Sequence, residues 1–243
     1  MVTFMTAIKD ASILIVGASG GLGRELARLL ADRGAVLSCS ARSVESLASA
    51  GVPGTHFAAD ITDPAAVIDL VTSAVGVNGR LDGIIFAAGV VAFGPATEVT
   101  DEALMELFLV NTLGPIRVLR AARALLAESA TSGRDPFFLT LSGVVSESPT
   151  ANMAAYSASK SALNAFDQAA ARELRRVGIR ILDARPGHTD TELSQHPIAG
   201  TAPRLPAGLA PEAVAERLVQ AIENNEKDLP SSAFAPATVP VVT

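Results

Sequence analysis

The chain has 243 residues, of which 49% are hydrophobic, 4% are aromatic and none is Trp, and its net charge is −6 at neutral pH. This length is sufficient for one large α/β domain with a buried core. Acidic and basic residues are interspersed without a basic stripe, which argues against a nucleic-acid partner. The single cysteine, Cys39, excludes an internal disulfide and fits a reducing compartment, and its spacing from the three histidines is not that of a metal site.

Targeting and membrane segments are not predicted. No apolar run reaches about 18 residues, and the N-terminal segment lacks a charged start followed by a long apolar stretch. We therefore expect a cytoplasmic protein that does not associate with membranes.

Short apolar runs alternate with longer segments of helical periodicity along the chain. The runs predicted to be strands are 12–16, 36–40, 55–59, 83–87, 136–141, 179–184 and 229–234. The segments predicted to be helices are 21–33, 44–50, a helix from Pro64 capped by Asp63, about 101–130 with a bend near Gly114-Pro115, about 152–176, and 211–224. This alternation predicts a single α/β domain over residues 1–243, with a doubly wound, Rossmann-type parallel sheet of about seven strands and helices on both faces.

Two segments lack periodicity. The Pro/Gly-rich stretch 190–210 is predicted to be a flexible substrate loop, and the tail 235–243 is predicted to be loosely held.

A glycine-rich stretch, VGASGGLG from Val16 to Gly23, joins the first predicted strand to the first helix. Gly17, Gly21 and Gly23 permit a tight turn and a close backbone approach to a pyrophosphate at the positive end of the helix. Glycine is common in turns, but a plain turn would not need so many. The stretch therefore predicts a dinucleotide site.

The spacing Gly-x3-Gly-x-Gly resembles the loop of the short-chain dehydrogenase/reductase family, and further motifs of that family follow in order. They are Asp60, Ala88-Gly89, Asn111, Tyr156-x3-Lys160, and Pro186-Gly187 followed by Thr191. The chain departs from the family where Val16 replaces a Thr and where Phe86 and Ala87 replace two Asn. The cofactor-binding residues expected from the loop and the resemblance are Gly17, Ser19, Gly21, Leu22, Gly23, Arg42, Asp60, Ile61, Ala88, Gly89, Tyr156, Lys160, Pro186, Gly187, Thr189 and Thr191.

The segment after the second predicted strand favours NADP(H) over NAD(H). An NAD enzyme usually places an acid on the ribose about 20 residues after the glycine loop. Residues 36–43 contain no acid, whereas Arg42 can pair with a ribose phosphate. The alternative is that Arg42 is a solvated loop residue.

Tyr156 and Lys160 share one helix face and form a candidate acid/base pair. A free tyrosine has a pKa of about 10, and we expect the nearby ammonium to lower it. Tyr156 would then protonate the alkoxide formed by hydride transfer, or deprotonate an alcohol in reverse. Such a Tyr-x3-Lys spacing also occurs by chance, so the interpretation depends on the other motifs.

The resemblance implies that Asn111 supports a water relay to Lys160 and that a serine polarises the substrate carbonyl. Gly143 stands at the usual position of that serine, 13 residues before Tyr156, and Ser142 precedes it. Either Ser142 takes the role or the catalytic serine is missing. We favour Ser142 over Ser146 and Ser148, which lie further along the loop.

The leading hypothesis is an NADP(H)-dependent oxidoreductase acting on the carbonyl or secondary alcohol group of a small, apolar substrate, without a metal. A cofactor-binding sensor or interaction protein without reductase chemistry is the alternative. An epimerase or dehydratase is disfavoured, because the chain has little room for a substrate domain after Pro186. The resemblance also implies a homodimer or homotetramer.

Overall fold

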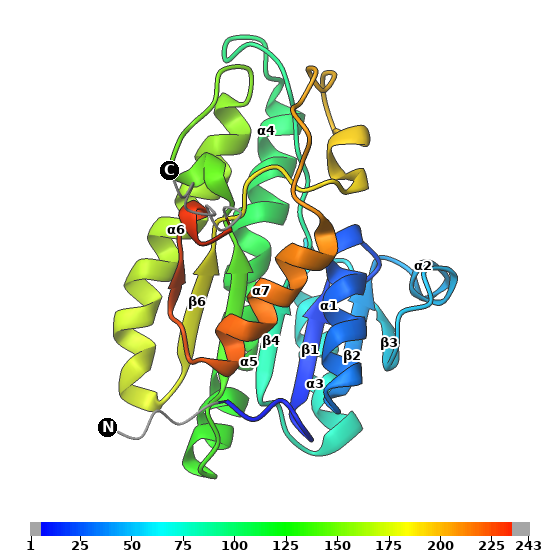
Figure 1. Ribbon diagram of the computed structural model, residues 1–243, viewed down its shortest axis with the longest axis vertical. Helices are drawn as coiled ribbons and strands as arrows, with labels where there is room; N and C mark the ends of the chain where they lie inside the picture. Colours follow the sequence, from blue (N-terminus) through cyan, green and yellow to red (C-terminus); the bar gives the residue numbers. More distant parts are fainter. Residues whose placement is uncertain (1–5, 235–243) are drawn as a thin grey trace, which may run out of the picture.

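The computed structural model describes residues 6–234 as an α/β structure around one parallel sheet (Figure 1). Its strands are β1 Ser12–Val16, β2 Val36–Ala41, β3 Thr55–Ala58, β4 Gly83–Phe86, β5 Phe137–Leu141, β6 Arg180–Ala184 and β7 Asp228–Leu229. They are ordered β3-β2-β1-β4-β5-β6-β7, so the chain changes direction across the sheet between β1 and β4. Ligands of such sheets bind at the carboxyl ends of the strands beside this switch point. The predicted seven-stranded, doubly wound fold is confirmed.

Helices cover both faces of the sheet (Figure 1). They are α1 Gly21–Asp32, α2 Val44–Ser49, α3 Pro64–Asn78, α4 Asp101–Phe108, α5 Gly114–Thr131, α6 Ala154–Leu174 and α7 Pro211–Glu223. Because side chains alternate along a strand, β1 contributes to two cores. Ile13 and Ile15 pack with α1 and α7, whereas Leu14 and Val16 pack with α3 and α5. None of the helices within residues 6–234 is long and apolar enough to cross a membrane.

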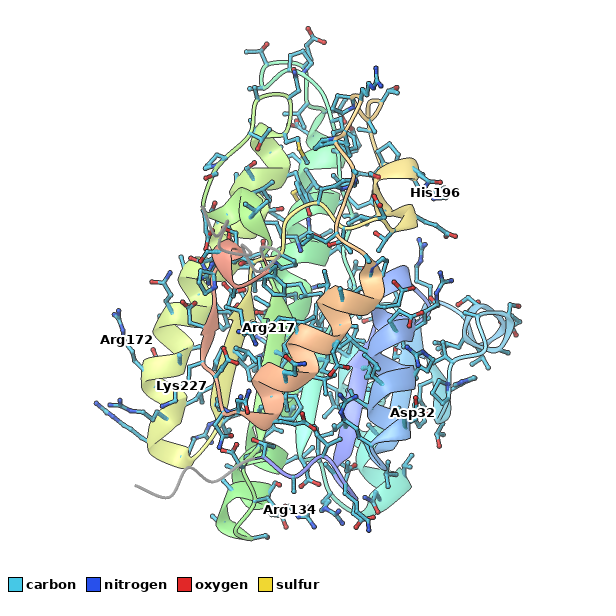
Figure 2. The ribbon with its side chains drawn as sticks, in the orientation of Figure 1. Asp32, Arg134, Arg172, His196, Arg217 and Lys227 are labelled. Carbon is cyan, nitrogen blue, oxygen red and sulfur yellow. The ribbon has the colours of Figure 1, made fainter. Side chains whose placement is uncertain are left out.

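Helix α6, which carries the candidate acid/base pair, has one buried and one exposed side. Leu163 and Ala170 are buried, whereas Arg172 is exposed and points outward (Figure 2). The helix begins at Ala154, two residues after the predicted start. Tyr156 and Lys160 therefore lie in its first two turns, at the end of the helix near the carboxyl edge of the sheet.

The long predicted helix is interrupted by a π-helical turn, Leu109–Leu113, which separates α4 from α5. Pro115 has no N–H to donate to the carbonyl of Asn111, four residues earlier, so regular α-helix cannot continue here. The irregularity thus falls close to the predicted bend and places Asn111 within it.

The predicted last strand, 229–234, is wrong in its extent. Only Asp228–Leu229 pairs with β6, and Ser231–Phe234 forms a 3-10 helix. Pro230, which stands between them, cannot donate to a strand ladder. The predicted loose tail, 235–243, lies outside the described residues.

The predicted substrate loop, 190–210, is tied to the domain by backbone hydrogen bonds. Ile198 N donates to Val91 O over 2.9 Å, and Phe93 N donates to Ala199 O over 3.0 Å. At the base of the loop, Asp190 N donates to Leu209 O over 3.0 Å. The loop therefore crosses the segment that follows β4, while its mobility stays a prediction.

Candidate active site

The glycine loop lies against the carboxyl ends of three strands. Gly17 N and Ala18 N both donate to Ser40 O at the end of β2, over 2.8 and 2.9 Å. Gly17 has a φ of 84°, and a Cβ there would lie 2.5 Å from Ala88 N, beyond β4. A Cβ on Gly23 would lie 2.2 Å from Gly17 O. Both positions therefore require glycine, and the loop can form a backbone cradle of the kind that accepts a pyrophosphate.

Helix α1 begins at the end of this cradle. Its N-cap residue, Gly20, supplies no side-chain acceptor to the first-turn N–H groups, so these remain suited to an anion. Ser19 and Leu22, also predicted to bind cofactor, are partly exposed in the loop and the first turn.

The segment after β6 crosses the same loop. A Cβ on Gly21 would lie 2.9 Å from the Thr191 methyl carbon, so glycine there lets the two segments meet. Thr189 lies two residues before Thr191 and donates its hydroxyl to Gly187 O over 3.1 Å. The structure thus brings the predicted Pro-Gly segment, which begins at Pro186, to the glycine loop.

The part of the cofactor site that is expected to hold the adenosine consists of residues that follow β2 and β3. Arg42 is exposed and makes no ion pair among residues 6–234. The Asp60 carboxylate accepts from the Thr62 backbone N–H and hydroxyl over 2.8 and 2.7 Å. These bonds, aided by the charge of Arg42, lower the pKa of Asp60. Ile61 is buried beside them.

At the other end of the candidate cofactor site, Gly89 lies beside the side chains of Asn111 and Lys160. The Asn111 amide group donates to Val90 O over 2.9 Å, and its oxygen accepts from Val90 N over 3.0 Å. A Cβ on Gly89 would lie 3.3 Å from Asn111 Oδ1 and 3.6 Å from Lys160 Nζ. Glycine therefore leaves room between the amide and the ammonium, and the predicted Ala88-Gly89 pair borders both.

Lys160 and Tyr156 are neighbours, as their spacing predicts. Lys160 Nζ donates to Leu141 O over 2.7 Å and lies 5.9 Å from the centre of the Tyr156 ring. Burial lowers the pKa of Lys160 to about 8, while the charges of Asp183 and Asp167 act in the opposite direction.

The expected lowering of the Tyr156 pKa is not found. Burial raises the pKa of Tyr156 to about 12. The ammonium group of Lys160 is bonded to the carbonyl of Leu141 and faces the tyrosine ring, so it does not offset the loss of solvent. Tyr156 is therefore protonated at neutral pH and is suited to donate a proton.

Ser142, the favoured candidate for the carbonyl-polarising serine, is fully buried and directed elsewhere. Its hydroxyl donates to Asp183 Oδ2 over 2.8 Å and lies 3.0 Å from the Ser146 hydroxyl. Gly143, at the family's usual position, has φ 74° and ψ 164°, a conformation open essentially to glycine alone. The geometry argues against Ser142 as the group that orients the substrate oxygen, and a serine at position 143 would not fit this backbone.

Sequence reasoning missed a buried polar cluster behind the Tyr–Lys pair. Asp167, Asp183 and Arg185 are each less than 9% exposed. Arg185 NH1 donates to Asp183 Oδ2 over 2.9 Å, and the Thr140 hydroxyl donates to Asp167 Oδ2 over 2.6 Å. Burial, aided by repulsion from Asp183, raises the pKa of Asp167 to about 8. The sequence contained a signal, because Asp183 lies within the apolar run 181–184 and Arg185 follows it directly.

A glycine cradle at the switch point of a doubly wound sheet defines a Rossmann-type nucleotide-binding protein. Comparison with known families agrees, since the model for short chain dehydrogenases matches residues 11–200. The chain belongs to the short-chain dehydrogenase/reductase family, a family of oxidoreductases.

Relatives share this fold over most of the chain. An uncharacterized oxidoreductase of Methylorubrum extorquens is 32% identical over 196 residues, 77% of either chain. A 3-ketoacyl-(acyl-carrier-protein) reductase from Brucella melitensis, solved with NADH, has a TM-score of 0.83 at 21% identity, covering 94% of this chain and 100% of its own. A short chain dehydrogenase from Burkholderia cenocepacia, solved with NADP, has a TM-score of 0.80 at 24% identity, covering 92% and 89%.

Proposed function

We propose that this protein transfers hydride between NADP(H) and the carbonyl or secondary alcohol group of a small substrate. The observation that carries the proposal is the meeting of Tyr156, Lys160 and Asn111 beside Gly89, at the same sheet edge as the glycine cradle. The structural neighbours with NADH and with NADP support a nicotinamide cofactor and do not discriminate between the two.

The preference for NADP(H) rests on Arg42. Its guanidinium is exposed beyond β2, near Asp60, and is suited to a ribose phosphate. The backbone N–H groups of the glycine loop and the first turn of α1 would hold the pyrophosphate.

The proton chemistry follows from the two side chains on α6. A bound nicotinamide would supply the hydride in reduction and accept it in oxidation. Tyr156, protonated at neutral pH, donates its hydroxyl proton to the substrate oxygen as the C–H bond forms. Lys160 is the adjacent proton source that restores Tyr156, and Asn111 helps to shape the path to it. In oxidation the same proton moves from the substrate hydroxyl to Tyr156.

In this proposal Tyr156 holds the substrate oxygen without help from Ser142, whose hydroxyl donates a hydrogen bond to Asp183. A cavity of about 350 Å³ lies within the 190–210 loop region, next to Thr191. Its lining mixes polar and apolar residues: His188, Asp190, Thr191, Ser194, Gln195, Ala202, Pro203 and Leu205. Tyr156, Lys160 and Asn111 are not among these lining residues, so the expected apolar substrate stays a prediction.

A catalytically inactive nucleotide-binding protein is the second candidate. It is favoured by the hydrogen bond from Ser142 to Asp183 and by the glycine at position 143, because neither position then offers a serine hydroxyl to the substrate. The two candidates differ in turnover, not in cofactor binding.

The test has two stages. Fluorescence titration with NADPH and NADH comes first, and tighter binding of NADH would overturn the argument from Arg42. A panel of polar and apolar carbonyl compounds is then screened with the preferred cofactor, in the parent protein and in Tyr156→Phe. We expect turnover that the substitution abolishes; binding without turnover, or turnover unchanged in the variant, would favour the second candidate.

A further inference from the structure

Asp183, on β6, lies directly behind the active-site lysine and accepts hydrogen bonds at both carboxylate oxygens. Oδ1 accepts from Ser142 N over 3.2 Å. Oδ2 accepts from the Ser142 hydroxyl over 2.8 Å, from Asn164 Nδ2 over 2.6 Å and from Arg185 NH1 over 2.9 Å. Asp183 is 5% exposed, so these bonds replace water around a buried carboxylate.

One peptide group connects this carboxylate to Lys160. The peptide between Leu141 and Ser142 gives its N–H to Asp183 Oδ1, and its carbonyl accepts from Lys160 Nζ over 2.7 Å. A carboxylate on the N–H side of a peptide strengthens the partial negative charge on its carbonyl oxygen. The ammonium is therefore bonded to an acceptor that Asp183 polarises.

We propose that Asp183 is a positioning residue for Lys160, which acts through the Leu141–Ser142 peptide to fix the ammonium beside Tyr156 and to keep it charged. The inference rests on the proposed function, because it assigns Lys160 the role of proton source. The Ser142 hydroxyl then has a place in the same device, as a donor that orients Asp183.

The hydrogen bonds from Asp183 through the peptide to Lys160 matter because the buried surroundings of Lys160 disfavour its charge. It is 6% exposed, and loss of solvent disfavours the ammonium. The titratable groups that act on it are Tyr156 and Asp167 on its own helix and Asp183 on β6. Of the two carboxylates that favour the ammonium, Asp183 has the larger effect on the Lys160 pKa, and burial raises the pKa of Asp167 itself to about 8.

Arg185 does not cancel the effect of the Asp183 carboxylate on Lys160, because Arg185 shares its charge with other carboxylates. It also pairs with Glu147 and, over 2.7 Å, with Asp228, whose side chain is 63% exposed. Asp228 therefore offers a matched control: it is a carboxylate of the same cluster that makes no bond to the Leu141–Ser142 peptide in the described part of the chain.

The test is a pH titration by NMR, and its first arm needs no variant. The chain has three lysines, Lys9, Lys160 and Lys227, so lysine-selective labelling gives three signals to assign. We expect the carbonyl carbon of Leu141 and the amide nitrogen of Ser142 to titrate with the same midpoint as Lys160. Titration of Lys160 without a response from this peptide would overturn the proposal.

The second arm compares Asp183→Asn with Asp228→Asn, each checked for folding by thermal melting. Asp183→Asn is expected to lower the Lys160 midpoint by about one pH unit, because an opposing charge is lost. The loss of reduction rate at high pH should move down by the same amount. Asp228→Asn should change neither. Equal shifts in both variants, or none in Asp183→Asn, would overturn the proposal.

These outcomes are separable from those of the proposed function, since the NMR titration requires no substrate. Coupling between Asp183 and Lys160 in a protein that reduces no carbonyl would support the positioning role and defeat the reductase proposal. An active reductase whose pH profile ignores Asp183→Asn would defeat the positioning role alone.

Discussion

Asp167→Asn should stabilise the protein at neutral pH, because it removes a carboxyl group that the fold buries at a cost. Asp167 is 2% exposed, and one of its oxygens, Oδ1, has no hydrogen-bond partner among residues 6–234. Its pKa rises from an ordinary 3.8 to about 8. The folded protein therefore binds a proton that the unfolded chain releases between pH 4 and 8, and stability falls as pH rises through this window.

The size of the effect follows from that shift. At pH 7 the pH is about three units above the pKa of Asp167 in the unfolded chain. At about 1.4 kcal/mol per unit, keeping this carboxyl protonated in the folded protein costs about 4 kcal/mol. Asparagine keeps an acceptor for the Thr140 hydroxyl and has no ionisation to suppress. Its buried amide has a desolvation cost of its own, about 1–3 kcal/mol. We expect a net gain of about 2 kcal/mol at pH 7, on the order of the difference between these terms.

Urea unfolding at several pH values between 4 and 9 measures this gain. The free energy of unfolding of the variant, relative to the parent, should increase from pH 4 and level off above about pH 8. Asp69→Asn, an exposed acid on α3, should change stability by less than about 0.5 kcal/mol at every pH. A gain at Asp167 that does not depend on pH, or a loss at pH 7, would refute the reasoning.

Three further substitutions in the site, Arg42→Ala, Gly17→Ala and Ser142→Ala, and one control in helix α3, Gly76→Ala, test separate parts of this interpretation. Arg42→Ala should weaken NADPH binding about tenfold or more and leave NADH binding unchanged, since one charged hydrogen bond is worth about 1.5–3 kcal/mol; equal losses by titration would contradict its role. Gly17→Ala should destabilise by about 3 kcal/mol in thermal or urea unfolding, because its Cβ would lie 2.5 Å from a backbone nitrogen at positive φ. In helix α3, a Cβ on Gly76 would meet no atom of residues 6–234 within 4 Å, so Gly76→Ala should increase stability by about 0.5–1 kcal/mol. Stability changes of the same sign in Gly17→Ala and Gly76→Ala would contradict this reasoning. Ser142→Ala should lower kcat/KM by less than about tenfold, whereas a loss of 10²–10³ would show that the hydroxyl acts on the substrate.

The fold could be predicted from the sequence because each strand is a short apolar run between turn residues. β1 and the start of β4 lie where the pattern places them, and the glycine loop between β1 and α1 identifies the switch point. The extent of the last strand was predicted wrongly because apolar residues lie at both ends of the segment, Leu229 before Pro230 and Ala233 and Phe234 after it, and hydrophobicity alone does not show where pairing stops.

The site was only partly readable, because chain spacing shows proximity and not the competing partners. The interval between Tyr156 and Lys160 predicts that they are neighbours. It does not show that the carbonyl of Leu141, from β5, takes the ammonium. Likewise the spacing between Ser142 and Tyr156 does not show that Asp183, on β6, accepts a hydrogen bond from the Ser142 hydroxyl. In both cases the hydrogen-bond partner, Leu141 O or the Asp183 carboxylate, comes from a neighbouring strand.

The most direct test of the central claim is transfer of deuterium from C4-labelled NADPH to a carbonyl substrate found in the screen. In the parent protein we expect deuterium on the carbinol carbon of the alcohol product. In Tyr156→Phe we expect kcat/KM to fall by about 10²–10⁴, with NADPH bound as in the parent. Product without deuterium at that carbon, or transfer at the parent rate in Tyr156→Phe, would contradict the central claim.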